Sequence, residues 1–308
     1  MLDERLRFDR RVSPGGYAWW YVDAESADGA AALTIIAFIG SVFSPYYAWS
    51  GRRAPENHCA LNVALYGRRR RWAMTERSRA RIDLAPDRFT IGRSALEWRK
   101  DELTIDIDEH GAPLPRPLRG RVTVRPAALT GRIFLIDAQG RHRWRPLAPR
   151  SHVTVAFDDP AVSWSGEGYF DANDGEEPLE DAFHSWNWAR LSAEGSPPLI
   201  LYDTAPRRGD PRRLALEVSA DGGLIERRSP PLVRAAPTPV FRMERLLGGN
   251  GARLSATLED APFYSRSLME TMVDARRYRG FHESFSGDRL RSPIVKAMLP
   301  FRMPRHDF

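Results

Sequence analysis

The sequence predicts an all-β protein with little helix, and three observations support this class. Aromatic residues are frequent, with nine Trp, nine Tyr and 14 Phe among 24 Pro and 23 Gly, which suits short strands joined by turns. Short runs rich in β-branched and aromatic residues recur along the chain. Residues 103–108 alternate apolar and polar side chains, which is typical of a strand with one buried face.

Antiparallel strands are expected in succession through the first half of the chain. The strand-like runs lie at residues 19–23, 33–38, 60–66, 72–76, 96–99, 103–108, 121–124, 133–136 and 153–157. A Pro-rich connection at 113–117 separates two of them. The basic run from Arg68 to Arg71 fits a solvated hairpin turn, with contact to a membrane surface as the alternative. The spacing predicts a closed or nearly closed barrel.

The uncharged segment 29–51 is long enough for a membrane-spanning helix, which needs about 20 mostly apolar residues. Such a helix would be an alternative to the all-β prediction. The first part of the segment is rich in β-branched residues, and Ser44 and Pro45 then interrupt it with turn-forming groups. The segment therefore predicts two buried strands.

The second half of the chain repeats the strand pattern. Strand-like runs lie at residues 163–170, 199–202, 214–218 and 224–227, and residues 267–278 predict one short helix. We expect a domain boundary near residue 150, which divides the chain into an N-terminal barrel at 1–150 and a C-terminal barrel at 151–308.

Charge and cysteine content restrict the partners and the compartment. The net charge of +6 permits attraction to nucleic acid or to an anionic membrane, but no zinc finger, RNA-binding signature or basic helix is present, so no nucleic-acid partner is expected. Cys59 is the single cysteine, which excludes an intrachain disulfide, and it is expected to be a buried structural residue. Residues 1–11 lack the apolar core of a secretory signal, which favours a cytoplasmic protein.

The motifs that usually carry cofactors are missing. The sequence contains no GxGxxG opening a helix, no GxxxxGK[ST], no GxSxG and no HExxH. We therefore expect no cofactor and no metal. An aromatic-rich β scaffold with carboxylates and histidines near tryptophans remains, and such a scaffold can hold an apolar molecule and perform acid–base chemistry on it.

Blocks of rare residues resemble the carotenoid 1,2-hydratase family, whose members are also called hydroxyneurosporene synthases. The resemblance begins with PGGYAWWYVDA at 14–24 and spans nearly the whole chain. The other matching blocks lie at residues 33–38, 40–47, 58–67, 72–77, 142–146, 164–171, 258–266 and 297–304.

The resemblance implies a fold and an activity. It implies tandem lipocalin-like (calycin-like) β-barrels that act without a cofactor on acyclic carotenoids such as neurosporene and lycopene in phototrophic bacteria. The expected reaction adds water to the terminal 1,2 double bond. Because the substrate is nearly insoluble in water, the chain is expected to meet the inner or intracytoplasmic membrane peripherally, through exposed aromatic and Arg side chains.

The resemblance also implies a catalytic set, an H-x-W pair followed by a Y-x-D pair, and these positions match His142, Trp144, Tyr169 and Asp171. Asp171 is expected to donate the proton and Trp144 to stabilise the cation. Tyr169 is expected to orient the acid and His142 to act as the water-positioning base. Further substrate-binding candidates are Trp164, Tyr46, Tyr47 and a second H-x-W pair, His184 and Trp186.

Structural interpretations compete with these roles. His142 fits a satisfied core histidine, Trp144 fits simple packing, Tyr169 fits a buried hydroxyl, and Asp171 fits a turn over residues 171–175. Two rival functions also remain: a lipocalin-like carrier that binds carotenoid without chemistry, and an assembly protein of the photosynthetic membrane.

Overall fold

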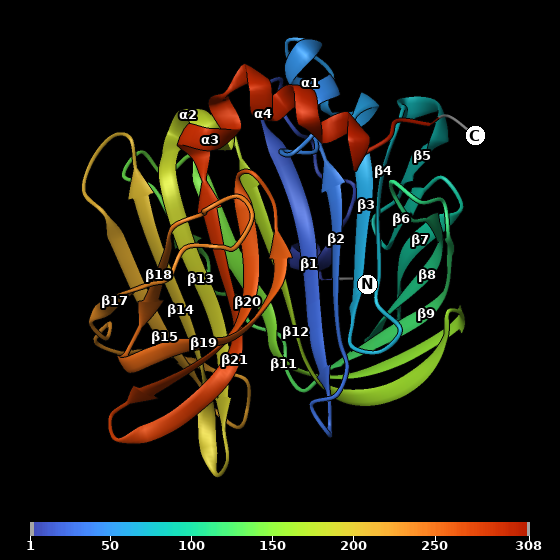
Figure 1. Ribbon diagram of the computed structural model, residues 1–308. Coiled ribbons are helices and arrows are strands. Elements are labelled where there is room, and N and C mark those ends of the chain that lie inside the picture. The colour runs from blue at the N-terminus through green and yellow to red at the C-terminus, as the bar shows by residue number, and fades with distance from the viewer. Residues whose placement is uncertain (1–2, 307–308) are drawn as a thin grey trace. The chain divides into compact units, whose positions relative to one another are not determined.

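The structure is a computed structural model that describes residues 3–306, and it is built mainly of antiparallel strands (Figure 1). The chain divides into two compact units. Among the described residues, the first contains 3–134, 142–178 and 296–306, and the second contains 135–141 and 179–295. The boundary expected near residue 150 therefore lies inside a strand of the first unit, and the chain passes to the second unit after Pro178.

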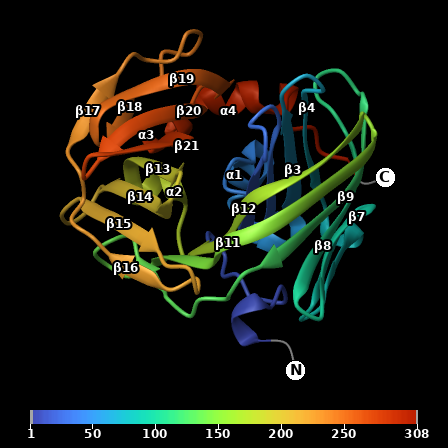
Figure 2. The same cartoon turned by 90° about the horizontal axis from the view of Figure 1, so that it is seen from below.

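A 12-stranded antiparallel sheet forms the first unit, in the order β4-β3-β2-β1-β12-β11-β9-β8-β7-β6-β5, with β10 paired to β11. Its strands are β1 (Tyr17–Ser26), β2 (Ala32–Ile39), β3 (Cys59–Tyr66), β4 (Arg71–Arg77), β5 (Ile82–Leu84), β6 (Arg88–Ile91), β7 (Ser94–Arg99), β8 (Glu102–His110), β9 (Pro117–Pro126), β10 (Phe134–Leu135), β11 (His142–Asp159) and β12 (Ala161–Gly175). Seen end on, this sheet curls round on itself (Figure 2).

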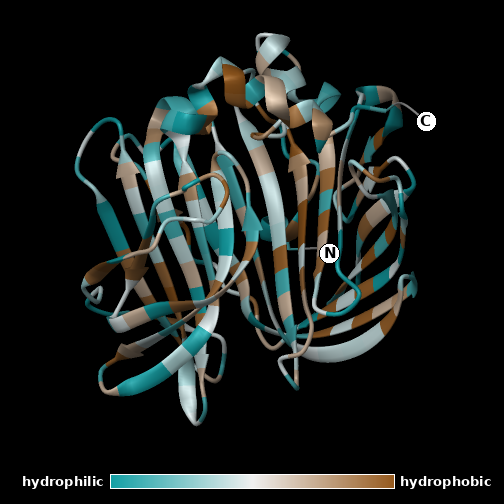
Figure 3. Cartoon of the chain, viewed as in Figure 1, coloured by the Kyte–Doolittle hydropathy of each residue, from teal (hydrophilic) through white to brown (hydrophobic). Residues whose placement is uncertain are grey.

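One face of the curled sheet lines a single apolar core. On β1, Trp20 and Val22 belong to this core, and side chains from β3, β8, β9 and β12 join them. The alternate residues of β1, including Tyr21 and Asp23, point to the opposite face because side chains alternate along a strand. The alternation appears as hydrophobic and hydrophilic bands along the strands (Figure 3).

The second unit contains a seven-stranded sheet in the order β16-β15-β14-β13-β21-β20-β19 and a two-stranded sheet, β17-β18. These strands are β13 (Phe183–Ala193), β14 (Ser196–Pro206), β15 (Arg212–Val218), β16 (Leu224–Glu226), β17 (Leu232–Ala235), β18 (Arg245–Gly248), β19 (Asn250–Asp260), β20 (Tyr264–Val273) and β21 (Arg276–Ser286). A smaller apolar core includes Leu191, Leu201, Leu247 and Met269.

Helices are short and lie at turns or near the C-terminus. They are α1 (Pro45–Trp49), α2 (Leu179–Ala182), α3 (Gly287–Arg291) and α4 (Pro293–Met298), with 3-10 turns η1 (Glu4–Leu6), η2 (Pro55–Asn57), η3 (Arg79–Arg81) and η4 (Leu299–Phe301). Within the part of the chain that the structure describes, no helix has the length and apolar character to cross a bilayer.

Two local predictions were wrong. The uncharged segment contains only one strand, β2, because Pro45 at the first turn and the Ser44 hydroxyl, which accepts from the amide of Tyr47, start helix α1 instead. The helix expected at 267–278 is the hairpin of β20 and β21, because strand pairing overrides a weak helical propensity. Most other strands lie where they were expected, although the run at 133–136 forms only the two-residue β10.

Candidate active site

The candidate site lies on the face of the first unit's sheet that is opposite to the apolar core. Three adjacent strands, β1, β12 and β11, present their side chains there. Across β1 and β12, Tyr21 pairs directly with Asp171 and Asp23 pairs with Tyr169. Across β12 and β11, Asn173 pairs with Trp144. The sheet register therefore brings the H-x-W and Y-x-D pairs to one surface, as the sequence predicted for neighbouring strands.

Asp171 is the centre of the group. Its Oδ2 atom accepts hydrogen bonds from the Trp144 Nε1 and from the Tyr169 hydroxyl, each at 2.8 Å. Trp144 and Tyr169 are fully buried, and Asp171 is 4% exposed. The segment 171–175 is the end of β12 and not a turn, so the turn interpretation of Asp171 is excluded.

Tyr169 keeps its proton at neutral pH. Burial, followed by the negative charges of Asp171 and Asp23, raises the pKa of the Tyr169 hydroxyl well above its ordinary value. A neutral phenol is a hydrogen-bond donor, so Tyr169 is able to orient the carboxyl group of Asp171.

A second Y-x-D pair lies beside the first and was missed from the sequence. The Tyr21 hydroxyl donates to Oδ2 of Asp23 at 3.1 Å, and the rings of Tyr21 and Tyr169 meet edge to face with centroids 6.1 Å apart. Asp23 is fully buried. The signal was present, because the triplet Tyr21-Val22-Asp23 has the same form as Tyr169-Phe170-Asp171 and lies in one of the family-like blocks.

His142 occupies the far end of this surface. Its Nδ1 atom is hydrogen-bonded to the Tyr17 hydroxyl at 2.8 Å, and its Nε2 atom lies 3.7 Å from Oε1 of Glu177. His142 pairs with Gly175, four residues beyond Asp171 on β12. At about 3.3 Å per residue this separation is about 13 Å along the strand. The structure therefore places His142 beside Trp144, and Asp171 lies further along the surface.

Asn173 lies between these groups and is a further residue that sequence reasoning missed. It pairs with Trp19 on β1 and with Trp144 on β11, so it stands between two indole side chains. Asn173 is 4% exposed, and its Nδ2 atom has no hydrogen-bond partner among the described residues. A buried amide of this kind is suited to hold a small polar molecule.

Tyr46 and Tyr47 lie on α1, and the structure gives them different surroundings. Tyr47 is buried, its hydroxyl donates to the Gly16 carbonyl at 2.9 Å, and burial raises its pKa to about 12. These contacts indicate an anchoring role for Tyr47. Tyr46 is half-buried, and its ring meets that of Trp49 edge to face at 5.8 Å.

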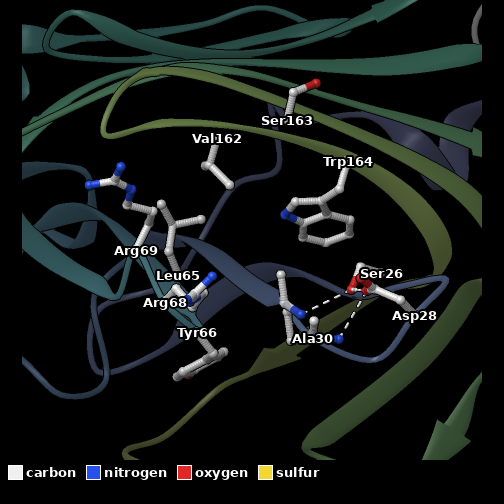
Figure 4. Close-up of a pocket in the computed structure, with 12 residues that line it drawn as sticks. Ser26, Asp28, Ala30, Leu65, Tyr66, Arg68, Arg69, Val162, Ser163 and Trp164 are labelled. Carbon is white, nitrogen blue, oxygen red and sulfur yellow. Dashed lines mark hydrogen bonds between the residues drawn. The ribbon is translucent and has the colours of Figure 1, made fainter.

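Trp164 lies away from Asp171. It is on β12, but it faces the apolar core side of the sheet and packs against that core. Its indole lines a pocket of about 300 Å³ together with Leu65, Val162, Arg68 and Arg69. Figure 4 shows these side chains around the pocket. These arginines are exposed in the turn between β3 and β4, as the sequence predicted.

His184 and Trp186 belong to the second unit, on β13. Trp186 is buried and stacks on Phe285 with ring centroids 4.0 Å apart, whereas the exposed His184 contacts Asp288 at 3.2 Å. Both line a pocket of about 370 Å³ within this unit.

The chemistry available at Asp171 is proton transfer. A carboxyl group removed from water favours its neutral form, while two hydrogen-bond donors on one oxygen stabilise the carboxylate that remains after a proton leaves. Within residues 3–306, no cluster of three or more His, Cys, Asp or Glu side chains is arranged to hold a metal ion. Cys59 is buried as expected, and burial raises the pKa of its thiol.

Comparison with known proteins identifies the family of the chain. The family model described as carotenoid hydratase CrtC matches residues 35–308. The chain belongs to the carotenoid hydratase family. The acyclic carotenoid 1,2-hydratase of Thiocapsa roseopersicina is 52% identical to this chain, over 97% of this chain and 75% of its own length. The acyclic carotenoid 1,2-hydratase of Rhodobacter capsulatus is 42% identical over 88% of this chain and 97% of its own length.

Solved structures show that this carotenoid hydratase family member shares its fold with more distant proteins. A putative AttH from Nitrosomonas europaea superposes with a TM-score of 0.62 at 13% identity, over 87% of this chain and 92% of that chain. Kievitone hydratase from Nectria haematococca superposes with a TM-score of 0.56 at 9% identity, over 91% of this chain and 92% of that chain.

Proposed function

We propose that this chain is an acyclic carotenoid 1,2-hydratase, which adds water across the terminal 1,2 double bond of acyclic carotenoids such as neurosporene and lycopene without a cofactor. Membership of the carotenoid hydratase family and the names of its relatives support the substrate class. The observation that supports the chemistry is the buried Asp171 carboxyl with two donors on one oxygen.

The first step of the proposed mechanism is protonation of the alkene. The protonated Asp171 gives its proton to carbon 2, the double-bond electrons form the new C–H bond, and a tertiary cation remains at carbon 1. The hydrogen bonds from Trp144 and Tyr169 stabilise the carboxylate that this step creates. The face of the Trp144 indole stabilises a nearby cation by about 0.5–2 kcal/mol.

Capture by water completes the reaction. The water oxygen bonds to carbon 1 and the water loses one proton. We propose that the buried amide of Asn173 and the imidazole of His142 orient this water, because both lie beside Trp144. His142 accepts the released proton and gives it up to solvent, and a proton taken up by Asp171 restores the acid, so the net change is the addition of one water molecule.

We also propose that the two units are tandem lipocalin-like barrels. The curled 12-stranded sheet around one core supports this for the first unit, and the seven-stranded antiparallel sheet with its own core supports it for the second.

Peripheral contact with a membrane is proposed as the route to the apolar substrate. In the first unit, Trp49 is 57% exposed, Phe301 is 72% exposed and Met298 is 43% exposed. Arg53 is an exposed cation near Trp49 in the sequence. Exposed aromatic side chains next to cations are suited to a lipid interface with anionic head groups.

Flotation with anionic and neutral liposomes tests the membrane proposal. We expect binding to anionic vesicles at low salt, and weaker binding of the double variant Trp49→Ser with Phe301→Ser. Met272→Ser, which changes an exposed apolar residue of the second unit, is the control. Absence of binding at low salt would contradict the proposal.

The activity itself is tested by anaerobic incubation of the purified protein with lycopene or neurosporene in lipid or detergent. Mass analysis of the extracted pigment in ordinary and oxygen-18 water is the measurement. A product heavier by one water molecule and carrying the solvent label establishes hydration. Pigment that binds with unchanged mass indicates a carrier and overturns the proposal.

A further inference from the structure

The two Y-x-D pairs place two buried carboxyl groups on neighbouring strands. Tyr21 is the direct partner of Asp171, and Asp23 is the direct partner of Tyr169, so each carboxyl lies one diagonal step from the other. Directly opposed Cβ atoms are about 4.5–5.5 Å apart and diagonal positions about 7–8 Å apart, within reach of side-chain charges. Asp23 is fully buried and Asp171 is 4% exposed, so water screens their interaction poorly.

The surroundings of Asp171 act in opposite directions on its proton. Two hydrogen bonds, from Trp144 and Tyr169, end on its Oδ2 atom, and hydrogen bonds of this kind favour a carboxylate. An acid that must protonate an alkene needs to hold its proton until the substrate arrives. Besides burial, the influence in the structure that favours the protonated form is a nearby negative charge.

Asp23 is the group positioned to supply that charge. The titratable side chains that the strands beside Asp171 present on this face are Tyr17, Tyr21, Asp23 and Glu25 of β1, Glu167 and Tyr169 of β12, and His142 and the exposed His152 and Asp158 of β11. Among them Asp23 is the buried carboxyl, because Glu25 is half-buried and Glu167 is exposed. The hydroxyl of Tyr21 donates to Asp23 and so stabilises its ionised form.

We propose that Asp23 and Asp171 share one proton, and that the repulsion between their charges keeps this proton on the pair until Asp171 transfers it to the substrate. Two buried carboxyl groups so close together ionise in two separate steps, and between these steps the pair holds a single proton. Hydrogen-bond donors on both carboxyls, Tyr21 on Asp23 and Trp144 and Tyr169 on Asp171, stabilise the single negative charge that the pair then carries. Asp23 is therefore a positioning residue that acts through Asp171, and the inference rests on the proposed function for its catalytic meaning.

Infrared spectroscopy tests the shared proton without substrate. With the aspartate carboxyl carbons labelled with carbon-13, the carbonyl stretch of protonated aspartic acid is measured at neutral pH. We expect one such signal in the wild-type protein to be lost in Asp171→Asn, and equally in Asp23→Asn and Asp23→Ser, because Asp171 then ionises. Asp23→Glu and the control Glu25→Gln should keep the signal. A signal that persists in both neutral Asp23 variants overturns the proposal.

The rate of hydration against pH is the second measurement. Loss of the Asp23 charge should move the alkaline loss of activity about one pH unit or more downward, with the rate recovering in acid. A uniform loss at every pH would indicate a structural role instead, and circular dichroism verifies that each variant is folded. If the wild-type protein shows the shared proton but does not hydrate carotenoid, the proposed function is wrong and the shared proton still stands. Hydration with unchanged spectra and profile in folded Asp23→Asn defeats only this inference.

Discussion

The Tyr17 hydroxyl and the His142 imidazole meet across the bare backbone of Gly175, with a 2.8 Å hydrogen bond between the hydroxyl and Nδ1. A Cβ atom at Gly175 would lie 2.6 Å from the same Nδ1 atom, closer than real side chains approach. Glycine at this position therefore gives His142 the space to reach its partner.

Gly175→Ala should displace this pair. We expect the free energy of unfolding to fall by about 1–3 kcal/mol, because the inserted methyl group overpacks a buried site. The variant should also hydrate carotenoid more slowly. Urea denaturation and the turnover number are the measurements. Tyr17→Phe is the comparison, because it removes the hydrogen bond and leaves the space unchanged. Normal turnover in both variants would argue against any role of His142 in orienting water.

Asp171→Asn should abolish hydration with little change in shape. The amide cannot donate a proton of comparable acidity, so we expect turnover to fall by about 10²–10⁴-fold while bound pigment remains detectable by absorbance. Glu167→Gln is the control, since this residue is exposed and four positions earlier on the same face of β12. Retained turnover in Asp171→Asn would remove Asp171 as the donor.

Trp144→Phe should slow the reaction while keeping an aromatic face. The change removes the Nε1 donor to Asp171, and a hydrogen bond to a charged group is worth about 1.5–3 kcal/mol, which corresponds to a rate lower by about 10- to 100-fold. The matched control is Trp98→Phe, because Trp98 lies in the apolar core with its ring centroid 5.7 Å from that of Phe170. Equal turnover in the two variants would show that the indole nitrogen is dispensable.

His282 should make stability fall in mild acid. Burial lowers the pKa of His282 to about 4, whereas the unfolded chain binds this proton near its ordinary pKa of about 6.5. The neutral form therefore favours the fold above pH 6.5, and this contribution is lost as the pH falls toward 4. We expect about 2 kcal/mol less free energy of unfolding at pH 5 than at pH 7 from this residue.

The measurement for His282 is urea unfolding at both pH values in the wild-type protein and in His282→Gln. Glutamine does not titrate, and its amide can still donate to the Leu246 carbonyl, which lies 2.9 Å from Nε2 of His282. The variant should lose this part of the pH dependence. The same decrease in both proteins would place the acid sensitivity elsewhere.

Local sequence patterns were sufficient to predict most strands. Residues 103–108 illustrate this, because Leu103, Ile105 and Ile107 are buried in β8 while Asp106 and Asp108 are partly exposed. The alternation is a property of neighbouring residues, so it can be read without knowing what the strand pairs with. The H-x-W and Y-x-D pairs were found through sequence resemblance to a known family, which is likewise a property of short segments.

What the local pattern could not supply was the pairing between distant strands. The sequence contains Tyr21-Val22-Asp23 and Tyr169-Phe170-Asp171 far apart, and only the register of β1 with β12 sets each tyrosine opposite the other aspartate. The same limit applies to Trp164, which was predicted to bind substrate. In the structure its side chain lies on the core side of β12. A shift of one residue in register reverses the face of every side chain, and register depends on the packing of the whole sheet.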